Sequence, residues 1–440
     1  MCTHCKYVYA ASIFHAHRFY TPSLMLVCML MMSALTGAFF FFILYFEVLL
    51  LIGFIQRVRR EKELADTTLT SHPSVEVIVP CFNEESTISG TIDSLLNLSY
   101  PKDKLTIHVV NDGSTDNSKD VLSAYAAHPQ VTISHKENGG KHSALNHAIQ
   151  HSTAEYIGCL DADSFVNTDA LIEILKTFQT TSAMAVTPAI KVEAPTSFFR
   201  HMQKAEYEVG ILFRRIFADN NAQFITPGPF SFYKREVFEQ LGLFRSAHNT
   251  EDLEMGLRMQ EAGYIIENAP SAVVYTRAPE RFHPLFKQRV RWAYGFLRNV
   301  PAYKHMFFSP KNIYLGFFIL PITLLSIFAA AYLPFALLKS TAFAAANKAV
   351  EFQTIGLSAF SFSVADIDWY SFTPTTLLYI TFALLFVTLT LVLAGKHIAG
   401  EKVCIDRGTL YYIGLYGIFG PIWLTKALFD AIFVRKNSWR

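Results

Sequence analysis

The sequence predicts an open α/β domain that is flanked by membrane-spanning helices. Hydrophobic residues make up 51% of the 440 residues and charged residues only 17%. The apolar residues are concentrated in long runs near both ends, as in chains that cross a bilayer. Between the runs, from about residue 73 to residue 300, short β-rich segments alternate with helical patterns, which is typical of an α/β fold. The formal net charge of +2 gives no overall attraction to nucleic acid, so no such partner is expected.

The first apolar run extends from Leu24 to Ile55 and contains Glu47 as its only charged residue. About 20 apolar residues suffice to cross a bilayer, so residues 1–60 are expected to form an N-terminal segment with one transmembrane helix. The run is too long for a signal peptide, and no small-residue cleavage site closes it. Positive charge next to a span marks the cytosolic side, so the following domain should face the cytosol. These charges are Arg57, Arg59, Arg60 and Lys62.

The central region is expected to form a domain from residue 73 to residue 300. Its β-rich runs predict strands at 75–79, 105–110, 131–134, 156–160 and 184–187, and its helical patterns predict helices at 85–98 and 143–151. Six scattered cysteines, two of them in or next to predicted strands, are typical of a reduced cytosolic domain. Cys2, His4 and Cys5 would suit zinc, but no second pair follows at zinc spacing.

The C-terminal region, residues 310–440, is expected to contain about three transmembrane helices. Its apolar runs span residues 312–338, 372–394 and 409–433, and residues 341–366 between the first two read as an external loop or interfacial helix. The basic loop after the second run, with Lys396, Lys402 and Arg407, suits the cytosolic side. The last crossing stays open, because Gly420-Pro421 indicates a broken or re-entrant segment and the chain ends in Arg435, Lys436 and Arg440.

Acidic residues follow three of the predicted strands. Ligands of open α/β sheets bind beyond the carboxyl ends of the strands, where Glu84, Asp112, Asp161 and Asp163 lie in this sequence. Asp112 belongs to Asn-Asp-Gly-Ser, which is also a common plain turn. The two-residue spacing of Asp161 and Asp163 lets both carboxylates project to one side. Such a pair suits Mg²⁺ or Mn²⁺ that is completed by phosphate oxygens.

Thr250-Glu251-Asp252 precedes a helical pattern that ends at Gly263. Acidic residues in a first turn stabilise the helix dipole, which is one reason for this motif. The same dipole keeps Asp252 ionised near neutral pH. An ionised carboxylate can act as the general base for a sugar hydroxyl.

Gln288, Arg291 and Trp292 share one face of a basic, aromatic helical segment just before the membrane. The segment also reads as an interfacial helix with its arginines reaching out of the bilayer. On that face, Arg291 can hold a diphosphate through two hydrogen bonds, and Trp292 offers a flat apolar surface for a sugar ring.

Residues 73–300 resemble the family 2 glycosyltransferases, specifically the membrane-bound processive synthases of poly-N-acetylglucosamine, chitin, hyaluronan and cellulose. The ordered motifs are Val-Pro-Cys-Phe-Asn-Glu-Glu, Asn-Asp-Gly-Ser, Asn-Gly-Gly-Lys-His-Ser-Ala-Leu-Asn, Asp-Ala-Asp, Thr-Glu-Asp and Gln-Arg-Val-Arg-Trp. The resemblance implies a GT-A type, Rossmann-like domain flanked by transmembrane helices. It also implies an inverting enzyme that uses a UDP-sugar and Mg²⁺ or Mn²⁺ to elongate a β-linked polysaccharide.

The resemblance also implies roles for single residues. Asp112 would contact uracil or ribose, with Glu84 and Lys141 nearby; the alternative for Lys141 is an exposed loop lysine. Asp163 would bind the metal and Asp161 would support the metal and the nucleotide. Asp252 would be the catalytic base, next to substrate-binding Glu251. The donor diphosphate and the acceptor sugar would be held by Gln288, Arg291 and Trp292.

Two features depart from the family pattern. The loop Thr226–Ser231 contains two prolines where relatives have small residues, which leaves the acceptor open, and no gating-loop motif follows Trp292. The expected partners are the UDP-sugar, a growing glycan or lipid acceptor, the plasma (inner) membrane that a multi-pass chain would cross, and export or accessory proteins. Addition of one sugar to a membrane lipid is the alternative reaction. A transporter or receptor would need more polar residues in its spans than Glu47, Lys426 and Asp430.

Overall fold

The structure, a computed structural model, describes residues 22–60, 68–356 and 376–434. The chain divides into two compact units. The smaller unit contains Met1–Tyr45 and Tyr332–Leu384, and the larger contains Phe46–Ala331 and Leu385–Arg440. Every candidate active-site residue belongs to the larger unit, which is described first, and Cys2, His4 and Cys5 lie outside the described residues.

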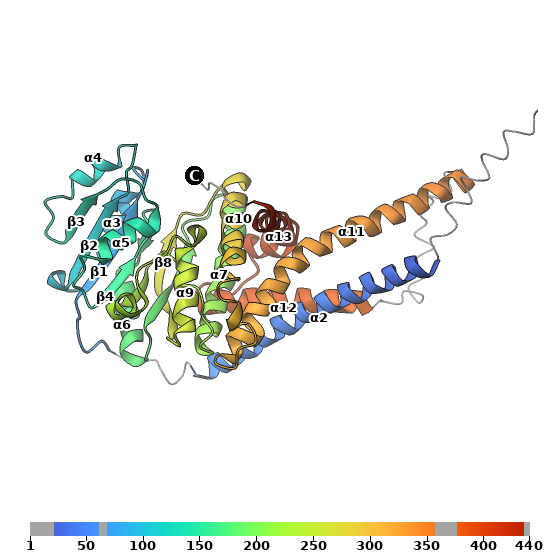
Figure 1. Ribbon diagram of the computed structural model, residues 1–440, viewed down its shortest axis with the longest axis horizontal. Helices are drawn as coiled ribbons and strands as arrows, with labels where there is room; N and C mark the ends of the chain where they lie inside the picture. The colour runs from blue at the N-terminus through green and yellow to red at the C-terminus, as the bar shows by residue number, and fades with distance from the viewer. Residues whose placement is uncertain (1–21, 61–67, 357–375, 435–440) are drawn as a thin grey trace, which may run out of the picture. The chain divides into compact units, whose positions relative to one another are not determined.

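One mixed sheet forms the centre of the larger unit. Its strand order is β3-β2-β1-β4-β7-β6-β8-β5 (Figure 1). Strands β1 to β4 run parallel to one another, whereas β7 is antiparallel to both β4 and β6, and β5 is antiparallel to β8. The bounds are β1 Val75–Cys81, β2 Leu105–Asn111, β3 Val131–His135, β4 Tyr156–Cys159, β5 Ser164–Val166, β6 Ala185–Val192, β7 Ser231–Lys234 and β8 Ile266–Thr276. The five predicted strands are therefore confirmed, as β1, β2, β3, β4 and β6.

Helices cover both faces of this sheet. Alternate residues of a strand point to opposite faces, so Val77 and Val79 of β1 pack in one core while Ile78 packs in the other. The first core includes α3 and α6, and the second includes α5, α8 and α9. The bounds are α3 Ile88–Leu96, α4 Ser118–Ser123, α5 Lys141–Ile149, α6 Ala170–Thr180, α7 Phe198–Asp219, α8 Arg235–Leu241, α9 Glu251–Glu261 and α10 Phe282–Asn299. The helices predicted at 85–98 and 143–151 are confirmed as α3 and α5; α3 begins three residues later and ends two residues earlier than predicted, and α5 is shifted by two residues toward the N-terminus.

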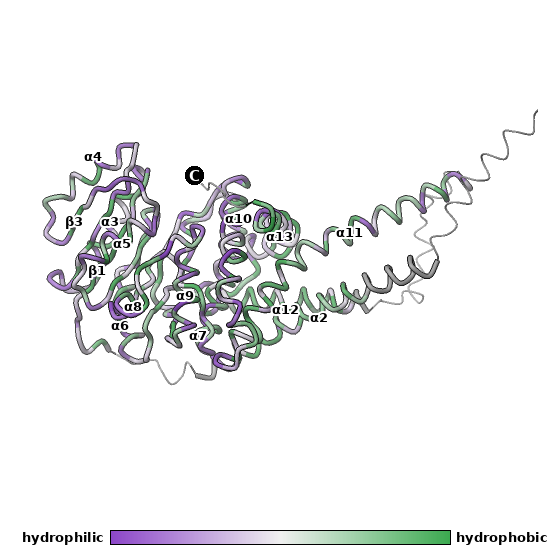
Figure 2. Tube along the Cα trace, in the orientation of Figure 1, coloured by the Kyte–Doolittle hydropathy of each residue, from purple (hydrophilic) through white to green (hydrophobic). Residues whose placement is uncertain are grey.

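Three helices among the described residues are long and apolar enough to cross a membrane. Their apolar segments are Ala34–Arg57 in α2 (Pro22–Arg60), Tyr314–Thr354 through the π-helical turn η5 (Tyr314–Ile319) and α11 (Leu320–Ile355), and Tyr379–Ile398 in α12 (Thr376–Ile398). Figure 2 shows the hydrophobic colouring along the described part of α12.

The expectation of a loop after residue 341 is wrong for residues 341–355, and the interfacial helix stays a prediction. Helix α11 continues through Pro334 to Ile355. The segment after Pro334 is rich in alanine, the residue with the highest helix propensity, which explains why the helix does not end there. Asp366 and Asp368 lie outside the described residues.

The last apolar run forms one continuous helix, α13 (Arg407–Phe433), so a break at Gly420-Pro421 is not observed. This helix is not among the three candidate spans. It packs against α7 and α10, with Trp423 and Ala427 buried beside Val290 and Tyr294. Lys396, which was expected in a basic loop, is instead buried at the end of α12 and paired with Asp406 at 2.6 Å.

Candidate active site

Hydrogen bonds join the loops that follow β1 and β2. These strands are parallel neighbours in register, so their carboxyl ends meet at one edge of the sheet. The backbone N–H of Asn83 donates to Ser114 Oγ at 3.1 Å, and the N–H of Thr115 donates to Asn83 Oδ1 at 2.8 Å. Asn83 has a φ of 57°, a conformation that asparagine tolerates better than most residues. This local structure fixes Glu84, whose N–H donates to Ser118 Oγ at 3.0 Å.

Asp112 is buried and its carboxylate is already occupied by groups of the protein. Oδ1 accepts hydrogen bonds from Lys136 Nζ at 2.7 Å and from the N–H of Gly139 at 3.0 Å. Oδ2 accepts from the N–H of Gly140 at 2.8 Å. Gly140 has a φ of 88° and immediately precedes α5. In this structure Asp112 therefore fixes the turn that leads into Lys141.

Lys141, the first residue of α5, connects two acidic segments. Its ammonium group forms an ion pair with Asp161 and lies 3.6 Å from Glu251 Oε1. Burial alone would lower the pKa of Lys141, but the charges of Asp161, Glu251 and Asp252 outweigh it and hold the pKa above its usual value. Lys141 is thus a charged bridge in the site, and the alternative of a free loop lysine does not hold.

Asp163 follows β4 and lies deeper than Asp161. Burial, and after it the charges of Asp161 and Glu84, raises the pKa of Asp163 to about 6. Ser164 Oγ donates to Asp163 Oδ1 at 3.1 Å, and this bond opposes the rise only in part. The negative charge of Asp161, Asp163 and Glu84 is therefore not neutralised by Lys141 alone.

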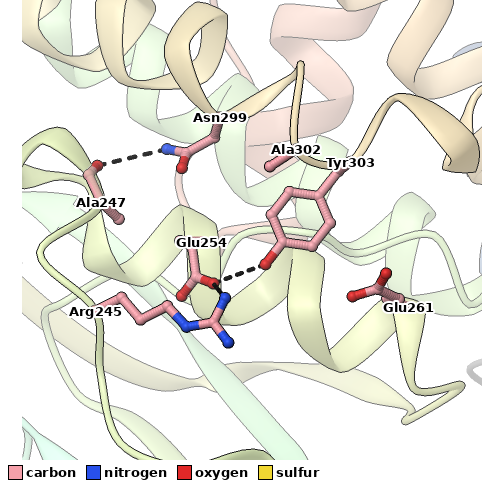
Figure 3. Close-up of a pocket in the computed structure, with 7 residues that line it drawn as sticks. All are labelled: Arg245, Ala247, Glu254, Glu261, Asn299, Ala302 and Tyr303. Atoms are coloured by element: carbon pink, nitrogen blue, oxygen red, sulfur yellow. Dashed lines mark hydrogen bonds and ion pairs between the residues drawn. The ribbon is translucent and has the colours of Figure 1, made fainter.

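An unusual turn leads into Asp252. Three consecutive residues without glycine, Ala247, His248 and Asn249, have φ values of 39°, 58° and 62°. Such conformations cost about 1–3 kcal/mol each and persist only where the surroundings enforce them. Asn299 of α10 donates to the carbonyl of Ala247 at 3.4 Å and to Thr250 Oγ1 at 3.2 Å, and Figure 3 shows the first of these bonds.

Asp252 lies at the start of α9, where its surroundings shift its pKa in opposite directions. Burial and the neighbouring charge of Glu251 raise its pKa to about 6. Lys141, the N–H of Leu253 and Arg291 act in the opposite direction. A carboxylate with a pKa near 6 is ionised at neutral pH yet basic enough to accept a proton from an attacking hydroxyl group.

The proline-containing loop lies directly at this cluster. Thr226 Oγ1 donates to the backbone carbonyl of Asp252 at 2.9 Å. A Cβ atom on Gly228 would overlap Lys141 Nζ and would lie 3.0 Å from Asp161 Oδ1. The loop that departs from the family pattern thus touches both the base and the ion pair.

Helix α10 brings its polar face to the same region. Arg291 Nη1 donates to the carbonyl of Asn249 at 2.9 Å, and its charge acts on Asp252. Trp292 is 39% exposed. Gln288 Oε1 accepts from Arg289 Nη1 at 3.0 Å. Arg291 thereby joins the cluster of Lys141, Asp161 and Asp252, whereas the contacts of Gln288 and Trp292 within the described part of the chain run to Arg289 and not to that cluster.

Residues 76–242 match the family model described as glycosyl transferase family 2. The chain carries a family 2 glycosyltransferase domain. Poly-beta-1,6-N-acetyl-D-glucosamine synthase of Staphylococcus epidermidis is 30% identical over 233 residues, which are 51% of this chain and 56% of that protein. The synthase of that name from Staphylococcus aureus strain COL is 28% identical over 271 residues, 58% of this chain and 65% of that protein. The match thus spans less than two thirds of either relative.

One solved structure is similar over nearly the whole chain. It is the mannosyltransferase PcManGT from Pyrobaculum calidifontis in complex with GDP-Man and Mn²⁺. The TM-score is 0.57 at 23% identity, and the alignment covers 92% of this chain and 99% of that one. This similarity confirms the predicted GT-A fold with flanking helices. The resemblance to membrane-bound family 2 synthases is likewise confirmed by the family model and the relatives.

Several residues near the site were not selected from the sequence. Gly228, Asn299 and Gly295 shape the site by contact: a Cβ atom on Gly295 would overlap the side chain of Thr250. Arg289 is buried next to Gln288 and Trp292 and was not selected as a site residue. The only sequence signal for Arg289 is its place inside Gln-Arg-Val-Arg-Trp, and we find none for Asn299.

A divalent cation would fit the acidic pair of the domain. No group of three His, Cys, Asp or Glu side chains that could hold a metal occurs within the described part of the chain. Asp163 and Asp161 nevertheless present two carboxylates, and burial, followed by the charges of Asp161 and Glu84, raises the pKa of Asp163 to about 6. Mg²⁺ and Mn²⁺ sites commonly use one or two carboxylates and complete the shell with water and phosphate oxygens, and this pair suits such a site.

Proposed function

We propose that the chain is an inverting glycosyltransferase that uses a UDP-sugar and Mg²⁺ or Mn²⁺ to elongate a β-linked polysaccharide. The observation that carries the proposal is the single electrostatic cluster of Asp161, Asp163, Lys141, Asp252 and Arg291. These residues come from one loop and three helices, and residues of plain structural turns would not need to share one cluster of charges. The names of the staphylococcal relatives support N-acetylglucosamine as the first sugar to test.

In the proposed reaction Asp252 accepts the proton of the acceptor hydroxyl group. The oxygen then attacks the anomeric carbon from the side opposite the diphosphate, so the bond to UDP breaks and the configuration inverts. Arg291 binds the diphosphate, and Lys141 places a second positive charge near it. A divalent cation held by Asp163 and Asp161 would neutralise charge that develops on the leaving diphosphate. Glu84 and Asp112 would shape the nucleotide end, Asp112 through the turn at Gly139–Gly140.

The proposed location is the cytosolic face of the plasma (inner) membrane. Basic residues follow the apolar segment of α2 directly, and α10 leads into the next apolar segment, Tyr314–Thr354. A growing glycan would therefore be made beside the bilayer, and its export through the spans or with accessory proteins belongs to the proposal.

The test is an assay of the purified full-length chain with UDP-N-acetylglucosamine, UDP-glucose and GDP-mannose, each with Mg²⁺, Mn²⁺ or a chelator. Nucleoside diphosphate release and product mass are measured together. We expect release from a UDP-sugar that depends on the cation, with products that increase by one sugar mass. Asp252→Asn should abolish transfer and retain UDP binding. Turnover by this variant at the wild-type rate would overturn the proposal.

Transfer of a single sugar to a membrane lipid is the second candidate. The chain carries helices long and apolar enough to cross a membrane, and these would bring the domain close to lipid. Product size separates the two candidates: a ladder indicates elongation, and a single lipid-linked product indicates one addition.

A further inference from the structure

The carboxylate of Glu206 connects three helices, α7, α10 and α13, next to Gln288 and Trp292 of α10. Glu206 of α7 accepts a hydrogen bond from Arg289 of α10 at Oε2, at 2.7 Å, and from the hydroxyl group of Tyr416 of α13 at Oε1, at 3.1 Å. Burial and the charge of Glu206 keep the pKa of Tyr416 far above its usual value, so its hydroxyl group stays protonated and donates. Both oxygens of Glu206 are thus used within the protein.

The guanidinium group of Arg289 makes two further contacts. Nη1 donates to Gln288 Oε1 at 3.0 Å, and Cζ lies 4.3 Å from the centre of the Trp292 ring. Arg289 is only 4% exposed, whereas Trp292 is 39% exposed. A desolvated guanidinium group over an indole is a favourable cation–π pair. Arg289 therefore covers one face of Trp292 and leaves the remainder of the ring accessible.

We propose that Arg289 is a positioning residue that, held by Glu206 and Tyr416, sets how Gln288 and Trp292 meet the acceptor sugar. A guanidinium group only donates hydrogen bonds, so Gln288 must turn its oxygen to Arg289 and its NH₂ group away from it. Gln288 then offers N–H donors to a ligand, which match the oxygens of a sugar. Trp292 offers one open face, which matches the apolar face of a pyranose ring.

This inference rests on the proposed function and assigns to α13 a part in acceptor binding. Because Tyr416 reaches Glu206 from α13, that helix acts on Arg289 through a hydrogen bond as well as packing against α7 and α10. The alternative is that the junction only holds α7, α10 and α13 together. If that alternative holds, substitutions at the junction should lower stability, transfer and hydrolysis alike. If Arg289 is a positioning residue, they should lower transfer to the sugar acceptor selectively.

The experiment compares transfer with hydrolysis of the donor in the full-length protein. The probes are UDP-N-acetylglucosamine and short β-1,6-linked N-acetylglucosamine oligosaccharides, with water as the competing acceptor. Arg289→Lys keeps the charge and loses the planar contact and the second hydrogen bond. We expect the ratio of transfer to hydrolysis to fall by at least about tenfold, as for other residues that orient binding groups. Tyr416→Phe should lower the ratio by about threefold, the contribution of one hydrogen bond.

Tyr412→Phe is the matched control, since Tyr412 lies one turn earlier in α13 and stacks on Tyr416 at 4.9 Å. It should leave the ratio unchanged. An unchanged ratio in both Arg289→Lys and Tyr416→Phe would overturn the inference.

A wild-type protein that releases no UDP refutes the proposed function for this donor, and a second measurement then still decides the inference. Acrylamide quenching of Trp292 fluorescence, obtained by difference with Trp292→Phe, should increase in Arg289→Lys, and unchanged quenching would contradict the contact.

Discussion

Gly228 lies against Lys141 so closely that a Cβ atom on the glycine would overlap the lysine Nζ. The ammonium group is held there by Asp161 and Glu251, one from the end of β4 and the other from the start of α9. Because the loop Thr226–Ser231 also binds the backbone of Asp252, it connects the ion pair of Lys141 and Asp161 to Asp252. The missing side chain at residue 228 is therefore part of the geometry of the site.

Gly228→Ala should lower activity without lowering stability. The atom that meets the new methyl group is the end of a flexible side chain, so Lys141 can move, but it then leaves Asp161. A displacement of about 1 Å can reduce turnover by about 100-fold, and we expect a loss of that order in kcat/KM. Gly414→Ala is the control, because no atom lies within 4 Å of a Cβ at that position. Wild-type kcat/KM in Gly228→Ala would show that the loop does not constrain the ion pair.

The pH at which the acid limb of the pH–rate profile falls should depend on the charge of Lys141. The pKa of Asp252 is about 6, and the base must be ionised, so activity should fall as the pH drops below about 6. The positive charge of Lys141 lowers the pKa of Asp252, so Lys141→Met should raise it and move the limb to higher pH. The measurement is kcat/KM from pH 5 to pH 8 at saturating cation.

Lys176→Met, in an exposed ion pair on α6, should leave the position of the limb unchanged. A limb that stays in place in Lys141→Met, while the rate falls, would assign the limb to another group. Asp163 is the other carboxyl group of the site with a pKa of about 6, and saturating cation should move its titration to lower pH.

The strand ends could be predicted from the sequence because each depends on a short stretch of chain. Val75–Val79 alternates between two cores, and Asp161 and Asp163 follow directly after a buried strand, so both the strand and the acidic edge can be seen locally. The antiparallel strand β7 between β4 and β6 could not be predicted, because its pairing joins residues far apart in the sequence. Likewise, the contact between Asn299 and Thr250 depends on how α10 packs against a turn 49 residues earlier.

The C-terminal helix shows a different limit of sequence analysis. Hydropathy counts the apolar residues of 409–433 but does not identify what they touch, and Trp423 and Ala427 are covered by α10 rather than by lipid. The left-handed turn at Ala247–Asn249 has no glycine that would have indicated it. Both features are determined by tertiary packing.

Without cation, Asp163→Asn should not lower the unfolding temperature, as is expected if Asp163 is a carboxylate that needs a cation. The folded protein raises the pKa of Asp163 from about 3.8 to about 6, so the ionised form opposes folding. The protonated Asp163 therefore adds to the free energy of unfolding below pH 4. This added free energy decreases by about 1.4 kcal/mol per pH unit and is lost as the pH rises through 6. In chelator at pH 7.5, Asp163→Asn should therefore unfold at a temperature equal to or above that of the wild type.

The same substitution should remove the response to the cation. Mn²⁺ that binds Asp163 raises the unfolding temperature of the wild type by mass action and should not raise that of Asp163→Asn. Asp120→Asn, on the exposed side of α4, is the control and should keep the response. Equal stabilisation of all three proteins by Mn²⁺ would place the cation elsewhere.

Asn299→Asp should uncouple catalysis from donor binding. The Asn299 amide donates to the Ala247 and Gly295 carbonyls and to Thr250 Oγ1, and a carboxylate cannot donate to either carbonyl. The three left-handed residues would then relax, and Asp252, which is the third residue after Asn249, would lose its orientation. We expect kcat to fall by about 100-fold, the cost of a shift of about 1 Å, while the Kd for UDP changes little.

The cavity beside this turn provides the control for Asn299→Asp. It measures about 270 Å³, and Ala302 lines it together with Asn299 and Ala247 (Figure 3). Ala302→Ser adds one hydroxyl group to the same wall and leaves the bonds of Asn299 in place, so it should keep wild-type kcat. If Asn299→Asp weakened UDP binding and lowered the unfolding temperature as much as it lowered kcat, the residue would support the fold as a whole. A selective loss of kcat means instead that α10 holds the base in its reactive position through Ala247–Thr250.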